Sequence, residues 1–272
     1  MTELSPCGEK VRQGDPVRFR TALFAPVDAR EGLFALYAFN LEIAKIAPMV
    51  SEPMIGEIRL QWWRDSLDMI FGDGAVRRHE VVEPLCAVVR SAGMPRAPFD
   101  ALIDARACDL DPGFPASSEA LQGYLRDTAG SLTLLAMHAL GGGSDDAALD
   151  AGQGVGIARY LDAVPVLASR GRKSLPGAID WRTMREGGTE DAFTAMVRGL
   201  AQDGRDAITR ARSMRGAVPK AAAPAFLEVP IADRVLAATL REIPDFARMT
   251  AERTSPFRAN FSMLWHGMTA RW

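Results

Sequence analysis

The stretch that decides the fold is LYAFNLEIAKIAPMVSE, residues 36–52. From Arg30 to Ile46, apolar side chains recur at steps of three and four residues, which is the spacing of one broad buried face on an α-helix. Such a helix is stabilised mainly by packing, so the segment predicts one member of a helical bundle. Pro48 lacks the amide hydrogen that a continuing helix needs, and it predicts a kink or the end of this helix.

Helical periodicity continues along most of the chain, whereas the alternation typical of strands is almost absent. Pro53 favours a helix start, and the stretches GDG (72–74) and GGG (141–143) favour helix ends. We therefore predict an all-α protein with one domain over residues 15–270 and a flexible N-terminus over residues 1–14. Further helices are expected over residues 53–70, 81–91, 99–108, 118–140, 147–168 (interrupted at Pro165), 191–214, 224–240 and 256–270, with an extended connection over 170–181.

The composition excludes several classes of protein. With 272 residues, 48% of them apolar, and a net charge of −2, the chain suits one large globular domain and gives no reason to expect nucleic acid as a partner. No run of about 18 apolar residues is present to span a membrane, and the N-terminus shows no apolar leader, so we expect a cytoplasmic location. The three cysteines and three histidines are scattered, which predicts neither a disulfide framework nor a zinc site.

Five motifs follow one another along the first two thirds of the chain: DPVRFRTALFAP (15–26), LYAFNLEIA (36–44), SEPMIGEIRLQWWRDSL (51–67), YLRDTAGSL (124–132) and SRGRKSLP (169–176). In this order they resemble the squalene/phytoene synthase family. The resemblance implies the all-α isoprenoid-synthase fold, a helical bundle around a central cavity that takes prenyl chains. Tyr37, Phe39 and Tyr124 are then expected to line that cavity.

Active members of that family carry two clusters of acidic side chains, which hold the Mg²⁺ ions that neutralise the departing diphosphate. The six matching positions of this chain carry no acid: Ala44, Lys45 and Pro48 in the first cluster, and Arg159, Ala163 and Leu167 in the second. The resemblance therefore implies a chain with no catalytic residue at these positions, no metal site and no cofactor.

Basic residues stand near both clusters instead. In active relatives, the basic group that follows the second cluster helps to hold diphosphate. One hypothesis is that the basic residues of this chain bind an anion without metal, such as a diphosphate, a lipid headgroup or an acidic partner segment. The alternative is that they are solvated side chains near a helix end. The residues are Lys45, Arg159, Arg170, Arg172 and Lys173.

The stretch GQGVGIARY, residues 152–160, contains a Gly-x-Gly-x-Gly pattern. A dinucleotide-binding loop with this pattern follows a β-strand, and no strand is expected here. The glycines are therefore interpreted as positions that allow two helices to pack closely.

Two functions from different classes follow from the resemblance. The favoured one is a pseudoenzyme that acts as an assembly or binding factor, because the chain resembles the non-catalytic branch of the family that serves respiratory complex I. Its implied partner is a complex I subunit or assembly intermediate at the inner face of the membrane, with peripheral membrane contact.

The alternative is an active head-to-head prenyltransferase that uses prenyl diphosphates and Mg²⁺. It would need Mg²⁺ held by acids outside the matching positions, such as Glu42, Asp65 or Asp162. Metal-free binding of a prenyl lipid or diphosphate in the old cavity overlaps with the favoured function.

Overall fold

Helix α3 (Val27–Ala44) lies in the middle of the molecule. All eight residues from 33 to 40 are buried, so the helix is covered on every side along this part and not on one face alone. A helix that is apolar all round belongs in the interior of a bundle. The computed structural model of the chain describes residues 4–169, 175–177, 191–241, 263, 265–267, 269 and 272.

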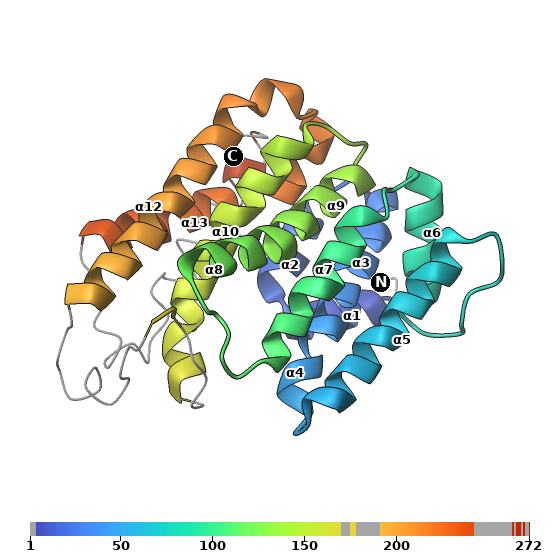
Figure 1. Cartoon of the computed structure of the whole chain (residues 1–272). Coiled ribbons are helices and arrows are strands. Elements are labelled where there is room, and N and C mark those ends of the chain that lie inside the picture. The colour runs from blue at the N-terminus through green and yellow to red at the C-terminus, as the bar shows by residue number, and fades with distance from the viewer. Residues whose placement is uncertain are drawn as a thin grey trace.

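Every regular element in the described ranges is helical, which confirms the predicted all-α class. Helices α10, α12 and α13 pack against one another on one side of the bundle, α5 and α6 pack together on the other, and α3 and α9 lie between them (Figure 1). Besides α3, the helices are α1 (Pro6–Gly14), α2 (Pro16–Ala22), α4 (Ile46–Met49), α5 (Pro53–Phe71), α6 (Val82–Ala92), α7 (Ala97–Ala107), α8 (Ser118–Leu125), α9 (Ser131–Ala139), α10 (Asp145–Ser169), α12 (Asp191–Ser213) and α13 (Val229–Arg241). Short 3₁₀ turns are η1 (Cys108–Leu110), η3 (Arg215–Ala217) and η4 (Lys220–Phe226), and η2 (Arg126–Gly130) is a π-helical turn.

The N-terminal segment corrects one prediction. Residues 1–14 were expected to be flexible, but residues 6–14 form α1, which packs against α3. The hydroxyl of Ser5 caps this helix by accepting a hydrogen bond from the amide of Gly8 at 3.0 Å, and Cys7 and Val11 are buried. Only these two apolar side chains anchor α1, which is too few to give a periodic signal in the sequence, and the expected boundary at residue 15 is too late.

Two predicted helices differ in detail from the structure. The single helix expected over 118–140 is divided by the π-helical turn η2. Helix α10 runs without interruption past position 165, where a break was expected. The helix expected over 256–270 and the extended connection over 170–181 lie largely outside the described residues.

The glycines of α10 do allow close packing, as predicted from their spacing. A Cβ atom added to Gly152 would lie 2.6 Å from the Cα of Gly130 and 2.7 Å from the hydroxyl oxygen of Thr133. On the opposite face of α10, a Cβ atom on Gly154 would lie 2.8 Å from the carbonyl oxygen of Gly204 in α12. Glycine at these positions lets α10 lie against η2 on one side and α12 on the other.

Candidate functional site

The first motif cluster lies where α3 ends. The helix stops at Ala44, Lys45 caps it, and a separate short helix, α4, begins at Ile46. Because Pro48 has no amide hydrogen, it cannot donate to the carbonyl of Ala44, and the helix ends one turn before the proline, as predicted. Lys45 and Pro48 are exposed, and the three motif positions do not share one continuous helix.

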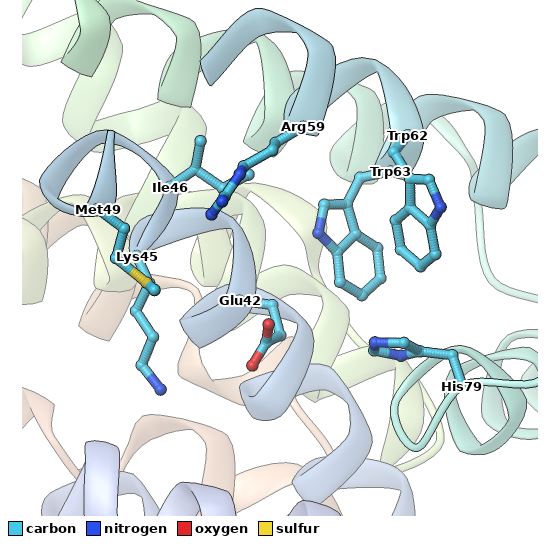
Figure 2. A pocket seen from close by; sticks show the side chains of 8 residues that line it. All are labelled: Glu42, Lys45, Ile46, Met49, Arg59, Trp62, Trp63 and His79. Carbon is cyan, nitrogen blue, oxygen red and sulfur yellow. The ribbon is translucent and has the colours of Figure 1, made fainter. Parts of the chain in front are cut away.

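Lys45 borders a hollow between the end of α3, α4 and the outer face of α5 (Figure 2). The hollow has a volume of about 440 Å³. Its one carboxylate, Glu42, is bound by the ammonium of Lys10 at 2.5 Å, which ties α1 to α3.

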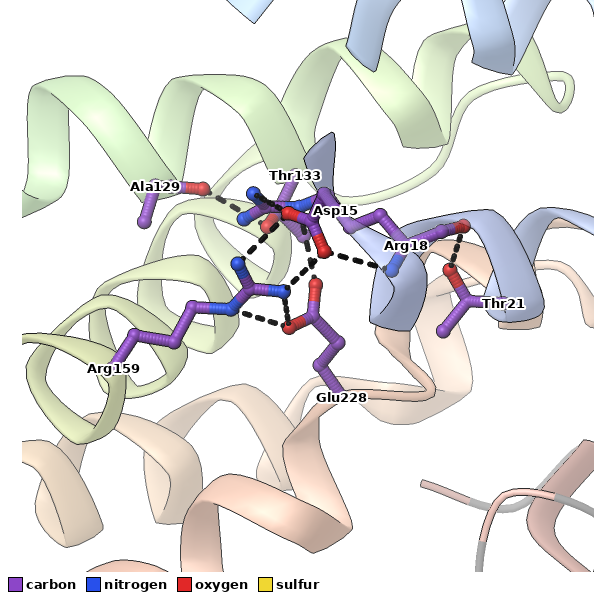
Figure 3. Close-up of polar contacts among 7 residues, drawn as sticks. All are labelled: Asp15, Arg18, Thr21, Ala129, Thr133, Arg159 and Glu228. Carbon is purple, nitrogen blue, oxygen red and sulfur yellow. Dashed lines mark hydrogen bonds and ion pairs between the residues drawn. The ribbon is translucent and has the colours of Figure 1, made fainter. Parts of the chain in front are cut away.

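The second motif cluster lies on α10, and its first position carries the most connected side chain of the site. The guanidinium of Arg159 donates two hydrogen bonds to the carboxylate of Asp15, at 2.8 and 3.1 Å, and one to Glu228 at 2.7 Å (Figure 3). Ala163 and Leu167 follow on the same helix and are half-buried. Arg159 is thus held by carboxylates from two other parts of the chain.

A second arginine completes this ion network, which we define as Asp15, Arg18, Arg159 and Glu228. Arg18 donates to Asp15 at 3.0 Å and approaches Glu228 at 3.1 Å (Figure 3). Asp15 also caps α2, because its carboxylate accepts the backbone amide hydrogen of Arg18. Two positive and two negative charges therefore balance one another where α2, α10 and the start of α13 meet.

The ion network lowers the pKa of Asp15 and raises the pKa of Arg159. Burial alone would raise the pKa of the Asp15 carboxyl, but the nearby guanidinium groups of Arg159 and Arg18 outweigh burial, and the net shift is downward. Burial would likewise lower the pKa of Arg159, yet the carboxylates of Asp15 and Glu228 raise it above its ordinary value. Both shifts favour the charged form, so Asp15 is ionised and Arg159 is protonated at neutral pH.

The lowered pKa of Asp15 gives a pH dependence with a definite sign. Because the folded pKa is below the unfolded one, the unfolded chain takes up the proton first as the pH falls. We expect the stability difference between the wild type and Asp15→Asn to be constant from about pH 5 to 8 and to shrink below about pH 4. Urea denaturation across this range measures it, and a difference that grows towards acid would contradict the assignment.

The central cavity of the bundle lies beside the ion network and has a volume of about 310 Å³. Its wall includes Asp15, Arg18, Arg106, Tyr124 and Arg159. Tyr124, one of the three residues expected to line a prenyl cavity, is in this wall. Arg106 donates to the Tyr124 hydroxyl at 2.5 Å, and both side chains contact the carboxylate of Asp109.

Two residues expected in the cavity wall lie in the core instead. Tyr37 is buried beneath Arg18, whose guanidinium carbon lies 5.8 Å from the ring centroid. Phe39 packs against Trp63 and Phe99, with ring centroids 5.2 and 5.8 Å away. Helix α3 borders this cavity through Asn40 and Leu41, and neither ring is among the described residues that line it.

The structure separates the basic residues that the sequence grouped together. Arg159 borders the central cavity, whereas Lys45 borders the hollow beside α5, so the two do not form one cationic opening. The remaining three members, Arg170, Arg172 and Lys173, lie outside the described residues.

The acidic partners of Arg159 were not identified from the sequence. Asp15 and Glu228 are 144 and 69 residues away from it, so no local spacing reveals the contacts. The pair Asp15–Pro16 is a helix-start signal and could have identified the capping role of Asp15.

Within residues 4–169, 175–177, 191–241 and the isolated C-terminal positions, no group of three or more His, Cys, Asp or Glu side chains is arranged to hold a metal ion. In the same part of the chain, no helix combines the length and apolar character needed to cross a bilayer.

Comparison with known proteins identifies the family. A sequence profile described as squalene/phytoene synthase matches residues 11–258, and the chain belongs to this family. Among curated proteins, the chain is similar to "NADH dehydrogenase (ubiquinone) complex I, assembly factor 6" of Bos taurus, with 31% identity over 234 residues, 82% of this chain and 69% of the relative.

Solved structures show the same fold. A dehydrosqualene synthase in complex with ligand superimposes with a TM-score of 0.77 at 16% identity, over 97% of this chain and 94% of the other. Squalene synthase HpnC from Alicyclobacillus acidocaldarius has a TM-score of 0.73 at 19% identity, over 87% of this chain and 92% of the other. The predicted isoprenoid-synthase bundle is thereby confirmed.

Proposed function

We propose that this chain is a pseudoenzyme of the squalene/phytoene synthase family that acts as an assembly or binding factor for respiratory complex I. The names of its curated relatives support the complex I partner. The proposed location is the cytoplasm, at the inner face of the membrane, and the proposed action is contact without prenyl transfer.

The observation that carries this proposal is the ion network around Arg159. The resemblance places an Asn or Asp that serves Mg²⁺ binding at position 159, and this chain has an arginine there that binds Asp15 and Glu228. The positive guanidinium of Arg159 repels Mg²⁺. It also binds the carboxylates of Asp15 and Glu228, so these oxygens are not available as metal ligands. The side chains at this position do not fit a metal ion.

The acids named in the alternative function do not restore a metal site. Glu42 is paired with Lys10 at 2.5 Å, and Asp65 accepts a hydrogen bond from Gln61 at 2.8 Å and lies 3.6 Å from Arg77. Asp162 is exposed on α10, one residue out of register and therefore about 100° around the helix from the matching position. Mg²⁺ prefers a converging set of free oxygen ligands, which these three do not supply.

The central cavity has room for one small molecule. Its volume of about 310 Å³ is at the lower end of the range of roughly 300–1,000 Å³ seen for pockets that hold one small molecule. Head-to-head condensation requires two prenyl diphosphates in one cavity at the same time. Binding of a single prenyl lipid or diphosphate without turnover remains compatible with the proposed role.

An enzyme assay tests the absence of turnover. Purified protein incubated with farnesyl or geranylgeranyl diphosphate and Mg²⁺ is expected to release diphosphate only at the rate of the protein-free control. The reason is that no carboxylate cluster neutralises the leaving group. Robust release that disappears when Mg²⁺ is chelated would restore the prenyltransferase alternative.

The assembly role needs a separate measurement. In a strain that lacks the chain, assembled complex I and its NADH oxidation activity are expected to fall, and a plasmid copy is expected to restore both. Normal levels of complex I in the deletion strain would contradict the role, whatever the enzyme assay shows.

A further inference from the structure

A second hollow lies between the end of α3, α4 and α5. We call it the α4–α5 hollow and name six of its eight described lining residues below; the other two are Glu42 and Ile46. Among the described residues it shares no lining residue with the central cavity, and its volume is about 440 Å³. Its lining side chains are drawn in Figure 2. The six residues are Lys45, Met49, Arg59, Trp62, Trp63 and His79.

The aromatic side of the hollow is preformed. Trp62 and Trp63 meet edge to face, with ring centroids 5.0 Å apart, and the ring of His79 lies 5.3 and 5.7 Å from them. Phe39 supports Trp63 from the core at 5.2 Å, and the guanidinium of Arg77 lies over Trp62. Rings held from several sides lose little entropy when a ligand packs against them.

Exposed apolar side chains continue this surface along α4 and the first two turns of α5. Met49 is 67% exposed, Met54 73%, and Ile58 64%. Ile55, one turn before Arg59, is also exposed. Apolar side chains grouped in this way beside a concave site are typical of an interaction surface.

Two cations on this surface lack an acidic partner. In the part of the chain that the structure describes, neither Lys45 nor Arg59 forms an ion pair. Both side chains border the hollow, Lys45 from the end of α3 and Arg59 from α5 (Figure 2). The nearby carboxylate of Glu42 is already bound by Lys10. The hollow therefore combines an apolar aromatic wall with two positive charges available to a ligand.

We propose that the α4–α5 hollow is the docking site for an acidic, apolar segment of a partner protein. An apolar side chain of that segment packs against Trp62 and Trp63, and its carboxylates pair with Lys45 and Arg59. The proposal rests on the proposed role as a binding factor and names the surface through which binding occurs.

The distribution of acids on the same surface favours a protein segment over an anionic membrane. Glu52 and Glu57 are exposed at the start of α5, between and beside the apolar residues. A bilayer with uniform negative charge would approach these carboxylates together with the cations. A polypeptide carries its negative charges at discrete positions, so they can lie beside Lys45 and Arg59 without approaching Glu52 and Glu57.

The test measures binding of a fluorescent model helix by anisotropy. The probe is an amphipathic Leu/Glu peptide, with a Leu/Lys peptide of the same pattern for comparison and vesicles of phosphatidylcholine and phosphatidylglycerol as the membrane arm. The protein is the full chain, as wild type and as Lys45→Glu/Arg59→Glu. Arg198→Glu/Lys220→Glu is the matched control, because both residues are exposed and the change in charge is the same.

The Leu/Glu peptide is expected to bind the wild type and the control equally, and the Lys45→Glu/Arg59→Glu variant about tenfold more weakly. The Leu/Lys peptide is expected to bind the wild type no more tightly than it binds the Lys45→Glu/Arg59→Glu variant. Equal binding to all three proteins, or no binding to the wild type, would overturn the docking site. If the vesicles bound the wild type and the control but not the Lys45→Glu/Arg59→Glu variant, the ligand of this hollow would be a lipid surface and the protein-segment proposal would be wrong.

These outcomes are distinct from a failure of the assembly role. Normal levels of complex I in the deletion strain would contradict the proposed function, but they would not change the result of the peptide-binding measurement. Conversely, if the Lys45→Glu/Arg59→Glu variant fully restored complex I in the deletion strain, the assembly role would stand and the α4–α5 hollow would have no part in it. All of the substituted residues are exposed, so circular dichroism is expected to show the same helix content in every variant.

Discussion

Replacing Asp15 by alanine should lower the free energy of unfolding by about 3–5 kcal/mol, the cost typical of removing one partner from a buried ion pair. Asp15 is only 7% exposed and binds both arginines of the ion network. Without it, Arg18 and Arg159 share the single carboxylate of Glu228. Denaturation in urea at neutral pH, read by the loss of helical circular dichroism, gives the change in midpoint.

Asp15→Asn is the matched control for this prediction. Asparagine caps a helix as well as aspartate does, so the variant keeps the hydrogen bond to the Arg18 amide and loses only the charge. Its loss of stability should be about 1 kcal/mol smaller than that of Asp15→Ala. If both variants unfolded at the midpoint of the wild type, the ion network would contribute nothing to stability.

Replacing Gly152 by alanine should also be strongly destabilising, by about 1–3 kcal/mol. In an open helix the same change stabilises, because alanine has the higher helix propensity. At position 152 the added methyl group would meet the backbone at Gly130, which cannot turn aside as a side chain can. Thermal or urea denaturation measures the result.

Gly199→Ala provides the opposite expectation within the same fold. Gly199 is exposed on α12, and nothing lies within 4 Å of the place where its Cβ would be. This substitution should stabilise by about 0.5–1 kcal/mol. A gain of stability at both positions would show that α10 and η2 are farther apart than the structure has them.

Much of the fold could be predicted from local sequence patterns. The apolar periodicity before Ala44, Pro53 at a helix start and the glycines that end helices each act within a few residues. Gly142, with a φ of 82°, confirms the helix end predicted at 141–143. The close-packing role of Gly152 was also predictable. Glycine lowers the stability of a helix interior, so its presence there indicates a position where a side chain would not fit.

The details of the site were less predictable because they depend on contacts between distant residues. Tyr37 and Phe39 look the same in sequence whether they face a cavity or the core, and only the neighbours of α3 decide. Arg159 looks like an available cation until Asp15 and Glu228 are seen beside it. The sequence shows that position 159 is an arginine, whereas the carboxylates that bind this arginine are visible only in the structure.

The ion network has a consequence for how this chain can change over evolutionary time. Positions 15, 159 and 228 lie on three separate segments, yet each charge is tolerated only because the others are present. An acid at position 159 would bring a third carboxylate up to Asp15 and Glu228 and leave Arg18 as the only compensating charge of the network. A charge change at one of these positions is therefore expected to destabilise the fold unless a second position changes with it.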